Sequence, residues 1–352
     1  MFSQLPKTSN ELFHHMLSEC ALALKMNTFL DNYDAERYDL DGVDKSKIFD
    51  ENQSANYYIW FFKNHERIYQ AYQLFADEYS KRLYLTLIAY RMTGHHSVRI
   101  PLEFSLGEAY NNYLASETHQ SSALGTGGMF GKLSHYDFVY KDVRYQADCL
   151  GLNYNVYRRQ YFLSRDGVSI APESGDYVID GGACLGETAV VFANAVGSEG
   201  MVYAFDPVHE HLQIVSHNAL QNPSLNIKAM PYGLSNIDVD CEPLKINAYA
   251  PGFNAFNKQV PLRSIDSLAI EGQVKRVDFL KMDIEGSEMQ ALTGALGSIR
   301  KFMPKLAISL YHRPDDLFEI PSFIHWHFPT YKMYLGHYTI HNEETVLYCS
   351  NS

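Results

Sequence analysis

The spacing of apolar and polar residues changes partway along the chain. In residues 11–30 and 56–92 the apolar positions recur at steps of three and four, and this period predicts amphipathic helices. The second stretch is long enough for two or three helices. The glycine-rich stretch 124–132 breaks the pattern and predicts a turn or hinge. We therefore expect a mainly helical N-terminal domain over residues 1–132.

A short β-rich connector is expected next, over residues 133–175. The runs YDFVY (136–140) and RRQYFLSRDGVSIAP (158–172) have strand-like composition, and Asp166-Gly167 has the residues of a hairpin turn.

From Asp176 onward, strand patterns alternate with helix patterns. Five short apolar runs have the character of buried strands, at 177–182, 200–206, 226–235, 277–283 and 305–312. Helical spacing occurs between them, at 187–195, 208–220 and 285–302. Two last runs, 331–339 and 344–349, predict a hairpin-like pair. This alternation predicts an α/β domain over residues 176–352, with a doubly wound, Rossmann-like parallel sheet and an antiparallel last strand.

Composition and net charge limit the classes of binding partner and the cellular compartment that fit this chain. The net charge of −12 argues against nucleic acid or an anionic membrane surface as the main partner. The five cysteines are odd in number and form no CxxC pair, which favours reduced thiols. No stretch resembles a signal peptide or an integral membrane segment. We expect a cytoplasmic protein.

Two acidic residues frame the glycine turn of the first strand–helix unit. Asp180 ends the first predicted strand, Asp206 ends the second, and Gly182 and Gly186 lie in the turn. In open parallel sheets the ligand binds at the carboxyl ends of the strands, and a carboxylate at the position of Asp206 can bind ribose hydroxyls. A dinucleotide and S-adenosylmethionine are the two ligands that fit this arrangement.

The sign of the charge decides between these two ligands. A pyrophosphate would be repelled by Asp180 and by Glu187 in the same turn, whereas the ammonium and sulfonium groups of S-adenosylmethionine are cationic. The sequence therefore favours a methyl donor. An NAD(P)-dependent oxidoreductase is the enzymatic alternative, and a methyltransferase-like binding subunit without catalysis is the other.

A family resemblance supports the methyl donor. The stretch VIDGGACLGETAVVFA resembles the first motif of the FkbM-type S-adenosylmethionine-dependent methyltransferases, roughly D-x-G-A-x-x-G. Downstream, KMDIEGSE resembles the family signature K-x-D-x-E-G-x-E, and AFDPV resembles the end of its second strand. The resemblance covers roughly residues 75 to 350. It implies a class I methyltransferase that methylates a hydroxyl of a sugar, on a nucleotide-linked or polysaccharide acceptor.

The motifs give a donor-binding set. We expect the first turn to hold the methionine part, Asp206 the ribose, and the loop after the third strand to lie near the adenine. The full set is Asp180, Gly182, Ala183, Gly186, Glu187, Thr188, Asp206, Pro207, Tyr232 and Gly233. Many relatives carry Asn where Cys184 stands, and the sequence assigns no role to this thiol.

Methyl transfer to oxygen also needs a base that removes the hydroxyl proton. Asp283 ends the fourth predicted strand and His312 the fifth, so these two are the leading candidates, followed by Glu285. Glu288 lies one helical turn beyond Glu285, on the same predicted helix face. Lys281 lies within the fourth strand and either pairs with an acid of the site or extends its ammonium to the surface.

Two further features leave alternatives open. Asp283, Glu285 and His312 are ligand types that bind Mg²⁺ or Mn²⁺, although the acids could serve without a metal. The N-terminal helices could cover the acceptor pocket, which would take a small-molecule or glycan acceptor, or they could form a homo-oligomer.

Overall fold

The computed structural model describes residues 2–29, 32, 51–101, 118–125, 132–140, 143–243 and 259–351. The chain forms two compact units: the first combines Met1–Phe104 with Arg313–Leu347 and Ser352, and the second combines Ser105–His312 with Tyr348–Asn351. Residues 313–347 therefore group with the N-terminal helices, a division that differs from domain boundaries at 132 and 175. Most of the predicted turn at 124–132 lies outside the described residues.

The first unit is mainly helical, as its apolar spacing predicts. It contains α1 (Ser9–Met26), α3 (Glu51–Leu74), α4 (Glu78–Thr93) and α11 (Asp316–His327). Asp77 separates α3 from α4, because its side chain accepts a hydrogen bond from the Ser80 backbone N–H at 2.7 Å and caps the second helix. The long pattern at 56–92 is thus two helices.

Polar contacts join α3 to α11 within the same unit. The Trp60 indole N–H donates to Asp315 at 2.6 Å, and Arg67 lies 3.0 Å from Glu319. Apolar side chains on α1 and α3, among them Met26 and Phe62, are exposed. The homo-oligomer that we expect through these helices stays a prediction. Among the described residues, no helix combines the length and apolar character that crossing a bilayer requires.

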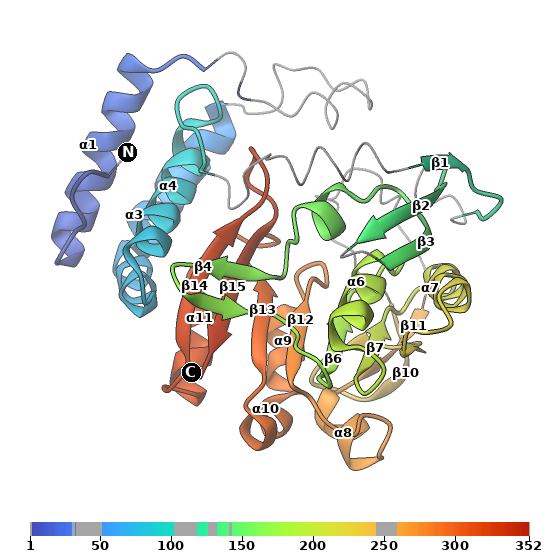
Figure 1. The fold of residues 1–352 in the computed structure, drawn as a ribbon. Helices are drawn as coiled ribbons and strands as arrows, with labels where there is room; N and C mark the ends of the chain where they lie inside the picture. Colours follow the sequence, from blue (N-terminus) through green and yellow to red (C-terminus); the bar gives the residue numbers. More distant parts are fainter. Residues whose placement is uncertain are drawn as a thin grey trace. The chain divides into compact units, whose positions relative to one another are not determined.

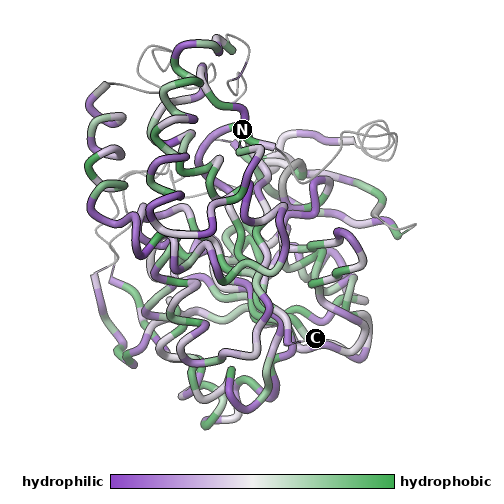
Figure 2. The backbone as a smooth tube through the Cα atoms, turned by 90° about the vertical axis from the view of Figure 1, so that its left-hand side faces the viewer, coloured by the Kyte–Doolittle hydropathy of each residue, from purple (hydrophilic) through white to green (hydrophobic). Residues whose placement is uncertain are grey.

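Five parallel strands form the core of the second unit (Figure 1). They are β6 (Tyr177–Gly181), β7 (Met201–Phe205), β8 (Ile227–Met230), β12 (Phe279–Met282) and β13 (Lys305–Ser309). Their order is β13-β12-β6-β7-β8, with every neighbouring pair parallel. Almost every residue in β6, β7, β12 and β13 is buried, so both faces of the sheet are covered. Figure 2 colours the backbone by hydropathy, and its green, hydrophobic stretches alternate with purple, hydrophilic ones along the chain.

The last two strands complete the expected topology. β15 (Thr345–Ser350) lies between β13 and β14 (Lys332–His337) in the seven-stranded sheet. Only a short connection joins β14 to β15, and parallel neighbours would need a crossover of a dozen or more residues. The two strands are therefore antiparallel, as the terminal hairpin pattern predicts.

The helices of the second unit flank the parallel strands. α6 (Glu187–Val196) packs against β6 and β7, and α7 (His209–Gln221) against β8. The helix expected at 285–302 is broken, which corrects that prediction: the chain forms α9 (Glu288–Thr293) and α10 (Leu296–Phe302), next to α8 (Ile265–Ile270). Gly294 separates α9 from α10, and a Cβ there would lie 2.0 Å from the Ser235 carbonyl oxygen.

Smaller sheets surround this core. The run expected as one strand at 226–235 is two, because β9 (Gly233–Leu234) leaves β8 to pair with β11 (Gln259–Arg263), which also pairs with β10 (Val239–Pro243). The connector, residues 133–175, holds β2 (Ser134–Tyr140), β3 (Val143–Cys149) and the π-helix η2 (Asn153–Tyr157), and β2 also pairs with β1 (Thr118–Ser121), a strand in the segment expected to be mainly helical. It ends in the hairpin β4 (Leu163–Arg165) and β5 (Val168–Ile170). Asp166 and Gly167 turn there with φ of 49° and 81°, which confirms the predicted turn.

Candidate active site

The turn between β6 and α6, which we call the donor turn (residues 180–188), depends on two glycines. Gly182 has φ of 75° and Gly186 has φ of 90°. A Cβ on Gly182 would lie 1.9 Å from the Asp283 carbonyl oxygen, and one on Gly186 would lie 3.2 Å from the Val215 Cα. These glycines let the donor turn pack closely against the end of β12 and against α7.

Asp180 is fully buried and already has two partners. Its register partner on β12 is Lys281, whose ammonium lies 3.0 Å from Asp180 Oδ1 and donates to the Gly182 carbonyl oxygen at 2.8 Å. The Thr188 hydroxyl donates to Asp180 Oδ2 at 2.6 Å. Burial opposes the charge of Lys281, but Asp180 and Asp283 outweigh it and raise the lysine pKa. Lys281 was expected either to pair with an acid of the site or to extend to the surface, and the structure shows the pairing.

Asp206 joins the donor turn to the end of β7. The backbone N–H of Cys184 donates to Asp206 Oδ2 at 3.1 Å, and the backbone N–H of Val208 donates to Oδ1 at 2.8 Å. The Nδ1 atom of His211 lies 3.1 Å from the same Oδ1. The residue is 6% exposed, and these three contacts hold its carboxylate in place. Oδ2 has one of these partners and keeps a second lone pair for a ligand hydroxyl, whereas Oδ1 already has two partners.

Glu187 and Cys184, both in the donor turn, have raised pKa values. Burial raises the pKa of Glu187 to about 7, and the nearby charge of Asp180 acts in the same direction. Glu187 is therefore only partly ionised at neutral pH. Burial, reinforced by Glu187, raises the pKa of Cys184 well above its usual range. A neutral thiol is a poor nucleophile, so the contribution of Cys184 comes from its backbone N–H.

The remaining donor-binding candidates lie at the ends of β7 and β8. A Cβ on Gly233 would be 3.6 Å from the side chain of Pro207, so these two positions adjoin. The Arg263 guanidinium covers the Tyr232 ring at 5.2 Å. Ala183 is buried, and its backbone N–H donates to the Phe205 carbonyl oxygen at 2.9 Å. The predicted donor-binding residues therefore gather at the carboxyl ends of β6, β7 and β8.

A second group of polar residues gathers after β12 and β13. Asp283 follows β12, and both of its carboxylate oxygens accept hydrogen bonds from phenols. Tyr161 donates to Oδ2 at 2.7 Å and Tyr311 to Oδ1 at 2.8 Å. Sequence reasoning assigned neither tyrosine a role at this carboxylate. Tyr311 adjoins His312 in the sequence, but Tyr161 carries no sequence signal for a role here, because 122 residues separate it from Asp283.

His312 is surrounded by three carboxylates, and we call these four residues the acidic cluster: Asp283, Glu285, Glu288 and His312. Its Nδ1 lies 2.9 Å from Glu288 Oε1, and its Nε2 lies 3.4 Å from Asp283 Oδ1 and 3.7 Å from Glu285 Oε2. Burial disfavours the imidazolium, but Glu288 and then the other two acids outweigh burial and raise the His312 pKa to about 10. His312 is therefore a cation at neutral pH.

Asp283 responds in the opposite way. Burial opposes its ionisation, but the charges of His312 and Lys281 and the two phenol hydrogen bonds outweigh that penalty and lower its pKa. Its side chain is 19% exposed, whereas Glu288 is 1% exposed. Asp283 is thus an ionised carboxylate that solvent or a ligand can reach, and this combination suits proton acceptance.

Glu285 and Glu288 do not share a helix face, which corrects the expected geometry. α9 begins at Glu288, and Glu285 precedes it with a left-handed φ of 56°. The buried Glu288 accepts a hydrogen bond from the Ile284 backbone N–H at 2.8 Å, while the Glu285 side chain is 33% exposed. Both acids still lie near His312, but from different sides of the turn.

Part of the acidic cluster could hold a metal ion. Ligand atoms of Asp283, Glu288 and His312 all lie within 4.8 Å of one another. Glu288, not the predicted Glu285, is the third member of that group. Oxygen and imidazole ligands in this number fit a divalent cation such as Mg²⁺ or Mn²⁺. The same atoms also form a complete ion-pair group around a protonated His312.

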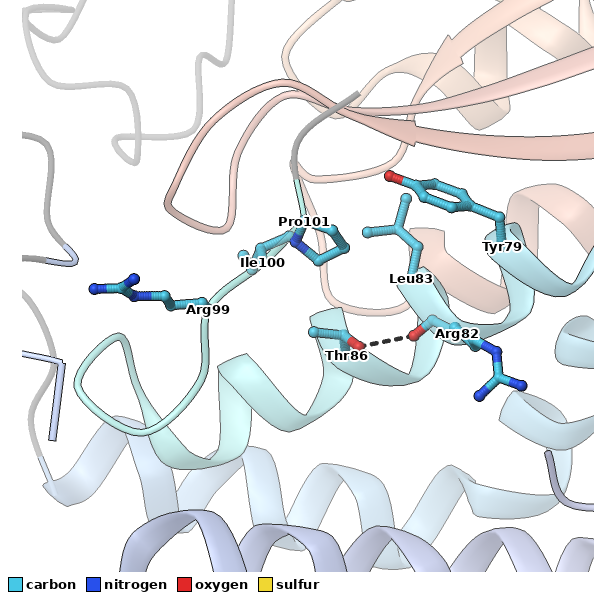
Figure 3. A pocket seen from close by; sticks show the side chains of 7 residues that line it. All are labelled: Tyr79, Arg82, Leu83, Thr86, Arg99, Ile100 and Pro101. Carbon is cyan, nitrogen blue, oxygen red and sulfur yellow. Dashed lines mark hydrogen bonds between the residues drawn. The ribbon is translucent and has the colours of Figure 1, made fainter. Parts of the chain in front are cut away.

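A separate pocket of about 440 Å³ lies in the first unit and contains none of the candidate site residues. Seven residues line it: Tyr79, Arg82, Leu83, Thr86, Arg99, Ile100 and Pro101. Figure 3 shows Tyr79, Leu83 and Pro101 near one another, while the guanidinium groups of Arg82 and Arg99 extend away from them. The Arg99 guanidinium lies 4.6 Å from the Phe29 ring centre. The residues that line this pocket include no carboxylate, histidine or cysteine.

Residues 180–333 match the family model of the methyltransferase FkbM domain, which confirms the resemblance seen in the sequence. The chain is similar to the crystal structure of methyltransferase FkbM from Methylobacillus flagellatus KT, with 21% identity and a TM-score of 0.54. That alignment covers 82% of this chain and 59% of the other, so this chain spans less than two thirds of that protein. The likeness shows a shared fold, the class I methyltransferase fold predicted from the sequence.

Two other solved structures resemble this chain more distantly. Aeropyrum pernix fibrillarin, solved with S-adenosyl-L-methionine bound, is 11% identical with a TM-score of 0.36, and the match covers 66% of this chain and 97% of that one. A putative rRNA-methylase from Clostridium thermocellum is 13% identical with a TM-score of 0.33, covering 51% and 87%. The comparison with curated proteins gave no match.

Proposed function

Since residues 180–333 form an S-adenosylmethionine-dependent methyltransferase domain of the FkbM family, we propose that this chain is an O-methyltransferase acting on a sugar hydroxyl. The observation that carries this proposal is the ionised, partly exposed carboxylate of Asp283 beside the donor turn. The sugar, on a nucleotide-linked or polysaccharide acceptor, is supported by the family resemblance of the motifs, and the cytoplasmic location by the cysteine spacing, which favours reduced thiols.

In this proposal the donor lies across the ends of β6, β7 and β8. Gly182, Ala183 and Gly186 shape the donor turn around the methionine part. Asp206 binds a ribose hydroxyl with the remaining lone pair of Oδ2, and the segment at Tyr232 lies near the adenine. Asp180 acts through Lys281 and Thr188, because all three side chains are buried and hold the base of the turn. S-adenosylmethionine supplies a cationic sulfonium with a transferable methyl group.

The chemistry is an in-line displacement at that methyl group. The hydroxyl oxygen of the acceptor forms the new O–C bond while the C–S bond breaks, and the electron pair of that bond stays on sulfur. The acceptor oxygen becomes acidic as it gains the methyl group, so even a carboxylate of low pKa can take its proton. Asp283 is the group that we place there. His312, as an imidazolium, is not the base but holds Asp283 and Glu285 in place.

A divalent cation is a second arrangement of the same site, favoured by the convergence of Asp283, Glu288 and His312. A cation there would bind the acceptor hydroxyl and lower its pKa. Dialysis against a chelator, followed by readdition of Mg²⁺ or Mn²⁺, tests it. Loss and recovery of turnover would support the cation, and unchanged turnover would remove it from the proposal.

The test of the function is a donor-consumption assay across a panel of nucleotide sugars and polysaccharides. We expect S-adenosylhomocysteine to form in proportion to a methyl ether on one acceptor class, identified by mass spectrometry of the product. Donor binding with no turnover on any acceptor would indicate a binding subunit, and NADH consumption without methyl transfer would indicate an oxidoreductase. Methylation at nitrogen would contradict the O-methyltransferase assignment.

A further inference from the structure

Tyr161 lies in the connector, upstream of the residues that match the family domain. It follows the π-helix η2 and precedes β4, and its φ of 126° is a conformation that non-glycine residues rarely adopt. Its side chain is buried, with the residue 2% exposed. A strained, buried tyrosine persists only where its surroundings hold it, and such residues are concentrated at functional sites.

The contacts of the Tyr161 phenol fix the direction of its proton. The Gln160 side-chain amide donates to Tyr161 Oη at 3.1 Å, while the phenol itself donates to Asp283 Oδ2 at 2.7 Å. The ring also faces a charge, because the Lys281 ammonium lies 5.1 Å from the ring centre. Tyr161 therefore contacts both residues that link the donor turn to the end of β12.

Asp283 cannot rotate freely between these partners. Tyr161 binds one carboxylate oxygen and Tyr311 the other, so the plane of the carboxylate is set by two phenols from different parts of the chain. The charged groups that face Asp283 are His312 and Lys281, with Glu285 beyond His312. None of these fixes the orientation of both oxygens as the phenols do.

The connector also contacts the donor turn independently. η2 packs against α6, the helix that begins at Glu187. The Asn155 side chain in η2 is hydrogen-bonded to Glu187. The connector thus contacts the donor turn at Glu187 and the proposed proton acceptor at Asp283.

From these contacts we propose that Tyr161 is a positioning residue that holds the Asp283 carboxylate toward the sulfonium methyl group, so that the active site extends upstream into the connector. The inference rests on the proposed function, because it assumes that Asp283 faces the donor's methyl group. It adds a residue that lies outside the matched domain and outside every motif of the sequence.

The test compares calorimetric Kd values of S-adenosylmethionine and S-adenosylhomocysteine, which differ by the charged methyl group. It needs no acceptor. Asp283→Asn should weaken S-adenosylmethionine relative to S-adenosylhomocysteine by roughly tenfold, since a nearby opposite charge is lost. Tyr161→Phe should produce part of that change, roughly two- to fivefold, with the S-adenosylhomocysteine Kd unchanged. Tyr136→Phe is the matched control. The Tyr136 phenol, on β2, donates to the Leu150 carbonyl oxygen at 3.3 Å.

The outcomes separate the two proposals. If Asp283→Asn changes the ratio and Tyr161→Phe does not, the positioning role is overturned and the proposed function stands. If neither variant changes the ratio of the two Kd values, Asp283 does not face the methyl group. Both the placement of the base and the role of Tyr161 then fail. If Tyr161→Phe weakens both ligands equally, or Tyr136→Phe has the same effect, the role of Tyr161 is structural only.

Discussion

The donor turn and the acidic cluster adjoin at the ends of β6 and β12, but they balance charge in different ways. In the donor turn, Asp180 is paired with Lys281, and the Cys184 backbone N–H donates to Asp206 at the end of β7. In the acidic cluster three carboxylates surround the single imidazole of His312. The donor turn uses its acids to hold its own shape. The acidic cluster keeps surplus negative charge, and we propose that the cationic methyl group of the donor lies beside it.

The largest effect should come from Asp283→Asn, which leaves the side chains of the donor turn intact but removes the proposed proton acceptor. We expect kcat to fall by about 10²–10⁴-fold, whereas the donor KM should rise only by roughly tenfold, in line with the weaker binding of S-adenosylmethionine. Steady-state assays on the acceptor found by the panel measure both. Asp240→Asn, an exposed acid paired with Arg263, is the control and should leave kcat unchanged. Survival of turnover in Asp283→Asn would place the base elsewhere.

Lys281→Met should break the internal pairing of the donor turn. It leaves Asp180 buried without its counter-ion, and we expect the free energy of unfolding to fall by about 3–5 kcal/mol in urea titrations. Lys305→Met is a matched control, since its partner Glu173 is 70% exposed and such pairs contribute about 1 kcal/mol or less. Equal losses in the two variants would show that the buried pair has no special role.

Asp206→Ala should weaken donor binding without touching the acidic cluster. It removes charge-assisted hydrogen bonds to the ribose, which contribute about 1.5–3 kcal/mol, and it also loosens the turn at Cys184. Calorimetry with S-adenosylmethionine measures the change. An unaltered Kd would refute the ribose role.

The pH dependence of stability should report on His312. Its pKa is about 10 in the folded protein and about 6.5 in an unfolded chain. The stabilisation is therefore complete below about pH 6.5 and is lost as pH rises through about 10. Urea titrations from pH 6 to 10 should show the wild type losing its advantage over His312→Gln across that window. A constant difference would mean that His312 does not carry the charge.

The smallest effect should follow Cys184→Asn. Cys184 has a left-handed φ of 49°, a conformation that Asn tolerates well and β-branched residues do not. We expect Cys184→Asn to change the free energy of unfolding by no more than about 0.5 kcal/mol and Cys184→Val to destabilise the protein clearly more. A large loss with Asn would show that the thiol itself matters.

The sequence predicts those parts of the site that depend on local spacing. Asp180 lies near the end of β6, Asp206 and Asp283 directly follow β7 and β12, and His312 lies three residues after β13. The carboxyl ends of parallel strands in one sheet meet at one edge. The helix expected at 285–302 was broken instead by a contact of Gly294 with Ser235, far away in sequence.

The partners of these acids were harder to predict. The pairing of Lys281 with Asp180 depends on strand register, which the apolar pattern of each strand leaves open. Tyr161 lies in the connector, where no periodicity or motif indicates a site. The Lys281–Asp180 and Tyr161–Asp283 contacts depend on packing between segments far apart in the sequence, so they become visible only in the folded structure.

Calorimetric titration of the wild type with S-adenosylmethionine, S-adenosylhomocysteine and NADH tests whether this chain binds a methyl donor. We expect a single site for each of the first two ligands and no detectable heat for NADH, because the surplus negative charge of the acidic cluster favours a cationic ligand and repels a pyrophosphate. Binding of NADH, with none of S-adenosylmethionine, would contradict it.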